Sequence, residues 1–331
     1  MSRIAVIGAG AWGTALSIVL ARGGRHQVQL WAYERDVRES IESTRINSLF
    51  LPGLKIPETV HVSNNLSATL EGAETVLTVM PSHHARRLYE QMKSDLPTEA
   101  VIVSATKGIE NGTHKRMSEV AADAAGVKRV AALSGPTFAK EVARGDPTAI
   151  TVASSDATVA STIQRQFGDP MFRVYTNDDV IGVELGGALK NVIAIAAGVV
   201  EGLGFGHNTA AALITRGLAE ITRLAVACGA RSQTLSGLAG MGDLVLTCTG
   251  GLSRNRTVGV ELGRGRKLRD IMAGMHGMVA EGVLTTDAAL GLAREHGIEM
   301  PITQQMHAIL HEEKSPKDAI RELMSRPGRE E

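Results

Sequence analysis

Short runs of valine and isoleucine alternate with longer amphipathic stretches between residues 3 and 178. This rhythm is typical of a mostly parallel sheet whose strands are joined by crossover helices. Strands are expected at residues 3–7, 28–33, 60–63, 75–80, 100–105, 129–133, 148–153 and 172–175. Helices between them are expected at residues 12–21, 84–94, 114–125 and 157–167.

The strand pattern ends near residue 178, and the later segments have a helical pattern interrupted by glycine-rich turns. We therefore expect an α/β domain over residues 1–178, a mostly parallel sheet with flanking helices, followed by an all-α domain over residues 179–331. A length of 331 residues agrees with two domains that each bury a core.

Composition and charge exclude several classes of protein. Thirty-five basic residues balance thirty-five acidic ones, whereas a general nucleic-acid-binding protein normally carries a basic excess. Cys228 and Cys248 form no CxxC pair, so neither a disulfide scaffold nor a cysteine-ligated zinc site is expected. No secretory signal is visible, and the apolar run at residues 192–200 is shorter than the roughly 20 residues that span a bilayer. We expect a cytoplasmic protein without a membrane anchor.

The ten histidines prompt a search for a metal site, but the chain contains no HExxH motif. His307 and His311 lie four residues apart with only alanine, isoleucine and leucine between them. Such a pair is more typical of a partly exposed helix face than of a ligand set, so no metal is expected.

A G-x-G-x-x-G segment directly follows the first expected strand, with its glycines at Gly8, Gly10 and Gly13. It opens an apolar helix that leads to a second strand, as in the dinucleotide-binding unit of a Rossmann-type domain. The glycines let the backbone approach a pyrophosphate, while the N–H groups and dipole of the helix N-terminus face its charge. The alternative is a glycine-rich turn without a ligand. We interpret residues 1–178 as a Rossmann-type dinucleotide-binding domain.

The choice of cofactor depends on the end of the second strand. An acidic side chain there binds the ribose hydroxyls of NAD, whereas a basic one accepts the extra phosphate of NADP. Glu34 favours NAD and the adjacent Arg35 favours NADP, so the sequence leaves both nicotinamide dinucleotides open.

Lys190 is unusual because, apart from Asn191, every other residue between Leu185 and Val200 is apolar or glycine. A helix that is apolar all round is normally buried, and desolvation would lower the pKa of this lysine toward the range useful for proton transfer. The alternative is that Lys190 reaches solvent at a helix edge.

Asp243 lies in a second apolar run, where a buried carboxylate needs a cationic partner. Soon afterwards, residues 253–257 gather a guanidinium, an amide and hydroxyls, a set suited to a phosphate or a carboxylate. Taken separately, each feature is more typical of a structural ion pair or a solvated turn than of a functional site.

Together, separated segments in the right order resemble the NAD(P)-dependent glycerol-3-phosphate dehydrogenase family in its bacterial biosynthetic form. The segments are residues 8–16, 47–53, 105–110, 133–139, 189–191, 240–243, 253–255 and 281–282. The resemblance implies reversible reduction of dihydroxyacetone phosphate to sn-glycerol 3-phosphate, the backbone precursor of phospholipids, by hydride transfer at C2. It also implies a homodimer, and it assigns substrate binding and catalysis to residues 179–331. Many bacterial members carry histidine or arginine near Tyr33 and Glu34, and this departure keeps both NADH and NADPH in play.

The resemblance also implies roles for individual residues. Lys190 matches the proton acceptor, which Asp243 would hold, with Asn191 and Thr247 as supporting polar groups. Lys107 matches a residue that touches substrate and cofactor and whose charge would stabilise an oxygen as it becomes negative. Substrate contacts are matched by Lys107, Gly135, Thr137, Lys190, Asn191, Asp243, Ser253, Arg254 and Asn255. Cofactor contacts are matched by Gly8, Gly10, Ala11, Trp12, Gly13, Tyr33, Glu34, Lys107, Ala139, Arg254, Val279 and Glu281.

Two other functions remain open from the sequence. One is a two-domain dehydrogenase of the β-hydroxyacid or 6-phosphogluconate type, which also pairs a nucleotide domain with a helical domain and a catalytic lysine. The other is a non-catalytic protein that senses NAD(P), which would have no use for a desolvated Lys190 or for Asp243.

Glycine is in excess only in the second part of the chain. Thirteen of the 36 glycines lie in residues 1–178, an average frequency, whereas 23 lie in residues 179–331, about twice the usual ~7%. We expect the glycines next to Lys190, Asp243 and Arg254 to bring the backbone close to substrate and cofactor where the two domains meet. They are Gly186, Gly187, Gly240, Gly242, Gly250 and Gly251.

Overall fold

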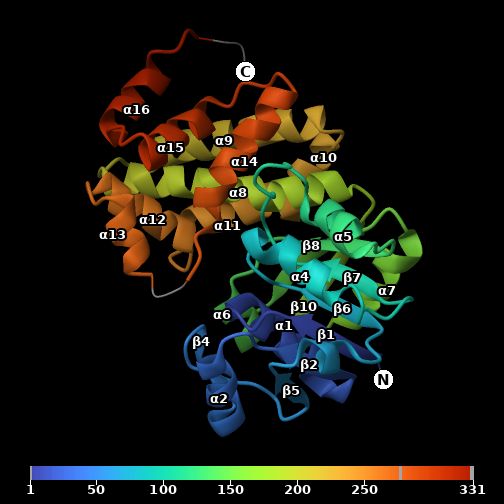
Figure 1. Ribbon diagram of the computed structural model, residues 1–331. Helices are drawn as coiled ribbons and strands as arrows, with labels where there is room; N and C mark the ends of the chain where they lie inside the picture. Colours follow the sequence, from blue (N-terminus) through green and yellow to red (C-terminus); the bar gives the residue numbers. More distant parts are fainter. Residues whose placement is uncertain (1, 276–277, 329–331) are drawn as a thin grey trace. The chain divides into compact units, whose positions relative to one another are not determined.

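The computed structural model describes residues 2–275 and 278–328 and divides into two compact units (Figure 1). The first unit comprises residues 1–107 and 116–184, and the second comprises residues 108–115 and 185–331. The chain therefore leaves the first unit after Lys107 and returns to it at Arg116. The boundary expected at residue 178 lies just before helix α8, which begins at Val180.

The first unit contains an eight-stranded sheet, and each of the expected strands is present in it. The strands are β1 (Ser2–Ile7), β2 (His26–Trp31), β5 (Val60–Ser63), β6 (Thr75–Thr78), β7 (Val101–Ser104), β8 (Val130–Ser134), β9 (Thr148–Ala153) and β10 (Phe172–Asn177). Their order across the sheet is β10-β9-β8-β7-β6-β1-β2-β5. Neighbouring strands are parallel except β8 and β9, which pair antiparallel. The mostly parallel sheet is thus confirmed.

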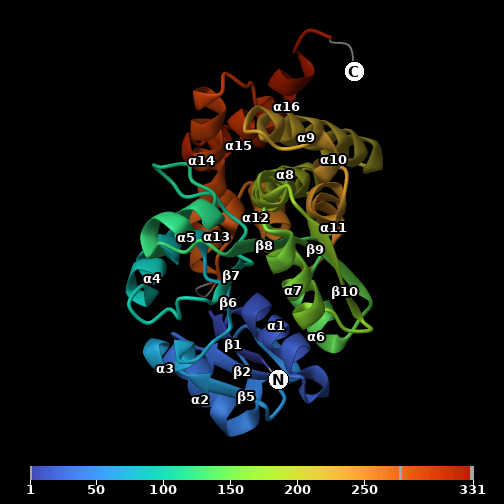
Figure 2. The same ribbon diagram turned by 90° about the vertical axis from the view of Figure 1, so that its right-hand side faces the viewer.

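Helices cover both faces of this sheet. Successive residues of a strand point to opposite sides, and here the side chains on both sides are apolar and need to be buried. Ile4 and Val6 of β1 belong to one apolar core, whereas Ala5 and Ile7 belong to the other. The first core includes residues of α1 (Ala11–Ala21), α2 (Arg35–Thr44), α6 (Ala139–Arg144) and α7 (Ala157–Phe167). The second includes residues of α3 (Leu66–Leu70), α4 (Ala85–Met92) and α5 (Met117–Ala125). Figure 2 shows this sheet from the side.

Two local features of the first unit differ from the sequence pattern. A short antiparallel hairpin, β3 (Ile46–Asn47) with β4 (Leu51–Lys55), lies outside the main sheet and was not expected. The helix expected from residue 114 begins only at Met117, so its expected start is wrong. His114 has a positive φ of 54°, and the carboxylate of Glu119 accepts the backbone N–H of Arg116 at 2.9 Å, which fixes the start of the helix.

Among the described residues from 185 to 328, the second unit contains helices joined by turns and no strand, as expected. Its helices are α8 (Val180–Gly202, entering from the first unit), α9 (His207–Ala227), α10 (Ser232–Leu235), α11 (Asp243–Thr249), α12 (Arg254–Gly263), α13 (Leu268–Ala273), α14 (Glu281–Glu295), α15 (Pro301–His311) and α16 (Pro316–Met324). By length and apolar composition α8 resembles a membrane span, with a mean hydropathy of 1.6, but 89% of that window is buried within the protein. The core helix of a globular domain has these properties.

The glycine surplus of the second unit is largely explained by close packing of its helices. A Cβ on Gly198 of α8 would lie 2.0 Å from the carbonyl oxygen of Arg256, and one on Gly259 of α12 would lie 2.0 Å from that of Ile195. Gly202 and Gly263 continue the same contact one turn further along. At these four positions, which lie outside the set expected to approach the ligands, the glycines admit the backbone of a neighbouring helix in the same unit.

Candidate active site

The three glycines of the loop between β1 and α1 differ in how much space a side chain would have. Gly8 has a φ of 120°, and a Cβ there would lie 2.9 Å from the carbonyl oxygen of Val79. A Cβ on Gly13 would lie 1.9 Å from the carbonyl oxygen of Gly8, so this position needs glycine for the helix to approach the strand. Around Gly10, by contrast, nothing lies within 4 Å of an added Cβ, which leaves the backbone open on that side.

The N-terminus of α1 fits an anionic ligand. Gly10 is its N-cap residue, no side chain caps the helix, and its first turn contains no acidic residue. The free N–H groups and the helix dipole therefore favour a phosphate group at this end. The indole Nε1 of Trp12 is buried without a hydrogen-bond partner among the described residues. A bound dinucleotide would satisfy the free N–H groups of this helix end, so the residues present fit the group that the sequence predicts.

The residues after β2 present both signs of charge to solvent. Tyr33 is 70% exposed, and Glu34 is the N-cap residue of α2 but makes no capping hydrogen bond with its side chain. Arg35 forms an ion pair with Glu39 one turn along the helix, with Nε and Oε1 2.6 Å apart. Exposed pairs at this spacing contribute little to stability, because solvent screens the two charges. A phosphate group could therefore compete with Glu39 for Arg35.

Further polar groups follow β7 and β8. The Nζ of Lys107, just beyond β7, donates to the carbonyl oxygen of Gly135 at 2.9 Å, and the hydroxyl of Thr137 donates to the same oxygen at 3.0 Å. Gly135 has a φ of 154°, and Ala139 begins helix α6. Because β1, β6, β7 and β8 are parallel, these residues and the glycine loop follow strand ends at the same edge of the sheet, where open α/β sheets bind their ligands.

In the second unit, Lys190 is buried in a polar cluster rather than extended to solvent. The residue is 6% exposed, and its Nζ lies 2.9 Å from Oδ1 of Asp243 and 2.8 Å from Oγ1 of Thr247. The Thr247 hydroxyl in turn donates to the backbone carbonyl of Asp243 at 2.6 Å. A π-helical turn, Leu238–Gly242, directly precedes Asp243 and positions its carboxylate at the start of α11. Lys190 is therefore the cationic partner that a buried Asp243 needs.

A close approach of backbones holds this cluster together. A Cβ on Gly186, one turn before Lys190, would lie 2.7 Å from the carbonyl oxygen of Ala239, and a Cβ on Gly240 would lie 2.0 Å from that of Leu235. Gly186 therefore lets α8 approach the π-helical turn that precedes Asp243, and Gly240 lets this turn pack against the end of α10.

A second polar chain begins at the next residue of α8. Asn255 Nδ2 donates to Oδ1 of Asn191 at 2.9 Å, and Oδ1 of Asn255 accepts the backbone N–H of Gly282 at 2.9 Å. Both amides are buried. The chain thus ties α8, the N-terminus of α12 and the N-terminus of α14 together beside Lys190.

The first turn of α12 carries the candidate anion-binding group. Ser253 caps this helix by accepting the backbone N–H of Arg256 at 3.2 Å, and Arg254 follows as an exposed side chain. The surrounding protein lowers the pKa of the Arg254 guanidinium through desolvation, and the negative charge of Glu281 opposes that shift. Val279 and Glu281 lie at the start of α14. The residues predicted for the second unit therefore fall into two groups. Lys190, Asp243 and Thr247 form one, and the others lie at the starts of α12 and α14 and at Asn191.

Cys248 lies next to Thr247 and is buried. Desolvation raises the pKa of its thiol to about 12, although the positive charge of Lys190 opposes the shift. A thiol in this state carries little of the nucleophilic thiolate at neutral pH, so Cys248 is not a candidate nucleophile.

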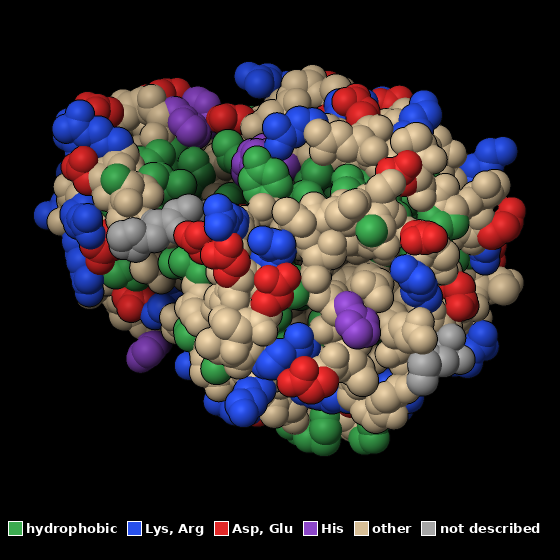
Figure 3. All heavy atoms as spheres, turned by 60° about the horizontal axis from the view of Figure 1, so that its bottom comes forward, with side chains coloured by type: hydrophobic (Ala, Val, Ile, Leu, Met, Phe, Trp, Pro, Cys, Tyr) green, Lys and Arg blue, Asp and Glu red, His purple; other side chains and the backbone are tan. Residues whose placement is uncertain are grey.

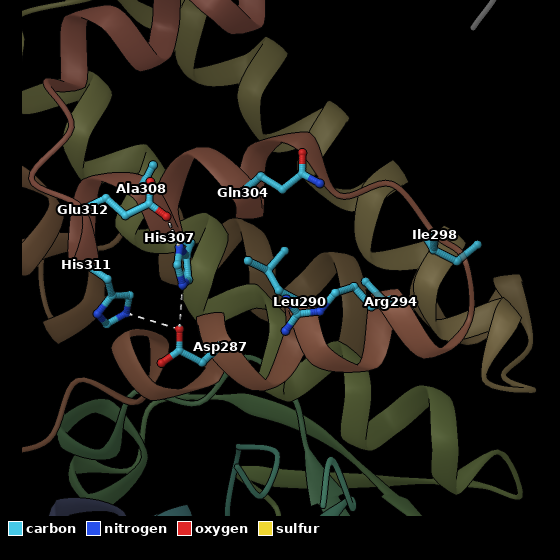
Figure 4. Close-up of a pocket in the computed structure, with 10 residues that line it drawn as sticks. Asp287, Leu290, Arg294, Ile298, Gln304, His307, Ala308, His311 and Glu312 are labelled. Carbon is cyan, nitrogen blue, oxygen red and sulfur yellow. Dashed lines mark ion pairs between the residues drawn. The ribbon is translucent and has the colours of Figure 1, made fainter. Parts of the chain in front are cut away.

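A cavity of about 720 Å³ elsewhere in the second unit contains none of the predicted site residues (Figure 4). It lies between α14 and α15, where the imidazoles of His307 and His311 both face Oδ1 of Asp287, at 3.3 and 3.5 Å. The two histidine side chains are each 32% exposed, in keeping with a partly exposed helix face. Among the described residues, no group of three or more histidine, cysteine, aspartate or glutamate side chains is arranged to hold a metal ion.

One residue that sequence reasoning did not assign to the site contacts the glycine loop directly. Asn47, from the unexpected hairpin, donates to the carbonyl oxygen of Ala9 at 2.7 Å. Asn47 lies in segment 47–53, which contributes to the family resemblance. Its position in the sequence, however, gave no indication that its side chain reaches the glycine loop.

Comparison with known proteins identifies the family. The model of the NAD-dependent glycerol-3-phosphate dehydrogenase N-terminus matches residues 3–160, and that of the C-terminus matches residues 179–321. Curated relatives named glycerol-3-phosphate dehydrogenase [NAD(P)+] are 69% identical in Koribacter versatilis, covering 99% of this chain and 98% of the relative, and 58% identical in Acidobacterium capsulatum, covering all of both. The crystal structure of glycerol-3-phosphate dehydrogenase from Coxiella burnetii is 43% identical with a TM-score of 0.94, covering 98% of this chain and 99% of that one. These matches favour the first of the three functions considered from the sequence. The chain belongs to the NAD-dependent glycerol-3-phosphate dehydrogenase family.

Proposed function

We propose that this protein is an NAD(P)-dependent glycerol-3-phosphate dehydrogenase that interconverts dihydroxyacetone phosphate and sn-glycerol 3-phosphate by hydride transfer at C2. The observation that carries the proposal is the buried Lys190, held by Asp243 and Thr247 in a chain of this family. A buried ion pair is costly and seldom adds net stability, so its presence favours a functional role.

The cofactor supplies the hydride in reduction and accepts it in oxidation. Lys190 moves the proton: on reduction its ammonium gives a proton to the C2 oxygen, and on oxidation the neutral amine takes that proton back. Asp243 stabilises the ammonium, and Thr247 limits the positions that Nζ can adopt. Asn191 supports the substrate beside Lys190, and the positive charge of Lys107 stabilises the C2 oxygen as it becomes negative.

Substrate recognition rests on groups that suit a phosphorylated three-carbon molecule. Arg254 supplies a planar guanidinium for phosphate oxygens, and Asn255 and Ser253 supply polar groups in the same helix turn. Gly135 and Thr137 of the first unit provide further contacts. Residues 1–178 then serve as the dinucleotide-binding domain, and residues 179–331 as the substrate-binding and catalytic domain.

Cofactor contacts in the first unit are assigned to the glycine loop and to the end of β2. The residues are Gly8, Gly10, Ala11, Trp12, Gly13, Tyr33, Glu34, Lys107 and Ala139, with Arg254, Val279 and Glu281 from the second unit. Glu34 suits the ribose hydroxyls of NADH, and the weak Arg35–Glu39 pair leaves Arg35 available to the extra phosphate of NADPH. We expect the enzyme to accept both cofactors.

The same proposal extends to the cellular setting. The enzyme would supply glycerol 3-phosphate for phospholipid biosynthesis. It would act in the cytoplasm as a homodimer, without a membrane anchor or a metal. On the face drawn in Figure 3, basic and acidic side chains are interspersed, a distribution that offers no extended basic surface to nucleic acid.

The test is the initial rate of NADH and NADPH oxidation with dihydroxyacetone phosphate, glyceraldehyde 3-phosphate and methylmalonate semialdehyde, the oxidised form of 3-hydroxyisobutyrate, as competing substrates. We expect turnover with dihydroxyacetone phosphate alone or far ahead of the others. No turnover with it under either cofactor would overturn the proposal.

Lys190→Ala tests the proton-transfer role. We expect this variant to lose its rate while nucleotide binding stays nearly intact, because Lys190 lies outside the glycine loop. Lys314→Ala, which removes an exposed lysine paired with Glu322 in the same unit, is the control and should keep its rate. If kcat survives in Lys190→Ala, the general acid is another group.

A further inference from the structure

We propose that Asn47 is a positioning residue for nucleotide binding, acting through the backbone of the glycine loop. The nature of the ligand rests on the proposed function, whereas the contacts stand on their own. Asn47 is 0% exposed and belongs to the β3–β4 hairpin, outside the strand-loop-helix segment that carries the glycine motif.

The amide of Asn47 uses all of its donors on this loop. Its Nδ2 donates to the carbonyl oxygen of Ala9 at 2.7 Å and to Oγ1 of Thr14 at 2.9 Å. Its Oδ1 accepts the backbone N–H of Phe50 at 3.0 Å, which ties the side chain to its own hairpin. Aspartate could replace the acceptor but neither donor, so the arrangement specifies an amide.

The Ala9 carbonyl is held from two sides. Besides Asn47, the hydroxyl of Thr14 donates to it at 3.2 Å. In a trans peptide the C=O and the following N–H point in opposite directions. Fixing the Ala9 carbonyl toward Asn47 therefore directs the N–H of Gly10 away from the hairpin.

The Gly10 N–H is a donor without a backbone acceptor among the described residues. Gly10 is also the one glycine of the motif with open space beside it. Its N–H and the first N–H groups of α1 are the donors that suit a pyrophosphate. Asn47 thus sets the orientation of a ligand-binding donor that it does not itself reach.

The experiment measures the dissociation constants of NADH, ADP and adenosine in the absence of substrate, for wild type and Asn47→Ala. We expect the Kd of NADH and of ADP, which carry a pyrophosphate, to rise about tenfold, a change of about 1.4 kcal/mol. The Kd of adenosine should change less than twofold. In turnover, the KM of the nucleotide should rise while kcat at saturating nucleotide and the KM of the other substrate stay within twofold.

A second pair of variants keeps the test informative if Asn47→Ala does not fold. Thr14→Val removes the hydroxyl that bridges Asn47 and Ala9, whereas Thr14→Ser retains it, so only the valine variant should weaken NADH binding. Thr69→Val is the matched control, because it removes an equally buried hydroxyl bonded to a backbone carbonyl, that of Asn65 at 2.8 Å, in another helix of the same unit.

The proposal is overturned if the Asn47 and Thr14 variants bind NADH as wild type does, or if adenosine binding falls as much as ADP binding. The wild type tests the proposed function separately. Tight NADH binding without turnover of dihydroxyacetone phosphate would refute the substrate assignment and leave the role of Asn47 standing, whereas a wild type that binds neither NADH nor NADPH refutes both.

Discussion

Lys190 and Asp243 form a buried ion pair, and the free-energy cost of burying their charges affects any test of their proposed function. Both side chains are nearly inaccessible, at 7% and 2% exposure, so the protein has removed two charges from water. Taking away one partner of such a pair typically costs about 3–5 kcal/mol, because the other charge remains buried alone. Loss of activity in a variant of either residue must therefore be measured alongside its stability.

Arg254 allows a sharper test at the residue scale, because Arg256 in the same helix serves as its control. Arg254→Ala should raise the KM for dihydroxyacetone phosphate by about tenfold or more with a smaller effect on kcat, since a charge-assisted hydrogen bond is worth about 1.5–3 kcal/mol. Arg256 pairs instead with Glu201, so Arg256→Ala should leave this KM unchanged. Equal KM values in the two variants would remove Arg254 from the phosphate site.

Cys248 gives a second residue-scale prediction, on reactivity rather than rate. Since burial raises the pKa of its thiol to about 12, the thiolate fraction at pH 8 is roughly one in ten thousand. We expect iodoacetamide at pH 8 to leave Cys248 unmodified in the folded protein and to alkylate it in denaturant, as read by peptide mass spectrometry. Equal labelling in both states would contradict this burial.

At the scale of elements, the contact between α8 and α12 depends on glycine. Gly259→Ala would normally favour a helix by up to about 1 kcal/mol, but its Cβ would lie 2.0 Å from the carbonyl oxygen of Ile195. We expect the variant to lose about 3 kcal/mol of unfolding free energy in urea, because two helix backbones must separate. Gly251→Ala, with nothing within 4 Å of its Cβ, is the control and should stay within about 0.5 kcal/mol. A neutral Gly259→Ala would refute the packing argument.

Helix α15 begins on a buried carboxylate from α9. The two oxygens of Glu220 accept the backbone N–H groups of Ile302 and Thr303, each at 2.9 Å, and the Thr303 hydroxyl at 2.7 Å. Glu220→Ala would leave these donors buried and unpaired, which costs about 1–3 kcal/mol. Urea unfolding monitored by circular dichroism measures this loss, and an unchanged midpoint would contradict the capping role.

The same carboxyl has a pH dependence of definite sign. Desolvation raises the pKa of Glu220 above its unfolded value, against the opposing hydrogen bonds from Thr303 and Ile302. The folded protein then holds this proton more tightly, so the associated stability is present below the unfolded pKa and is lost as the pH rises through the folded pKa. Relative to Glu220→Gln, which cannot ionise, wild type should lose unfolding free energy as the pH rises above about 4.3, the ordinary pKa of a glutamate.

At the scale of the whole molecule, the chain passes between the two units after Lys107, Lys115 and Glu184. We propose that two such chains form a homodimer, the commonest closed assembly of soluble proteins. Light scattering after size exclusion should give a mass twice the 35.0 kDa of one chain. A mass equal to that of one chain, across the concentrations used for the rate assays, would refute the dimer.

The sequence anticipated the first unit well because its signals are local. Alternation of apolar residues identified the strands, and the glycine loop after β1 follows from three positions within six residues. It failed at His114, where a left-handed residue delays α5, and at the hairpin of β3 and β4, because neither has a periodic pattern.

By itself, then, the sequence determined the sheet, the helical second half, the nucleotide-binding loop and the residues that carry the family resemblance. The apolar surroundings singled out Lys190 and Asp243 one by one, and within the sequence only the family resemblance joined them. Only the tertiary structure decided that Lys190 meets Thr247, 57 residues away, and that Asn47 holds Ala9, 38 residues away. It also decided that the glycines of α8 and α12 allow the backbones of these two helices to pack in contact. The physical reason is that periodicity and motifs depend on neighbours in the chain, whereas buried polar contacts and close backbone approaches depend on which distant segments pack together.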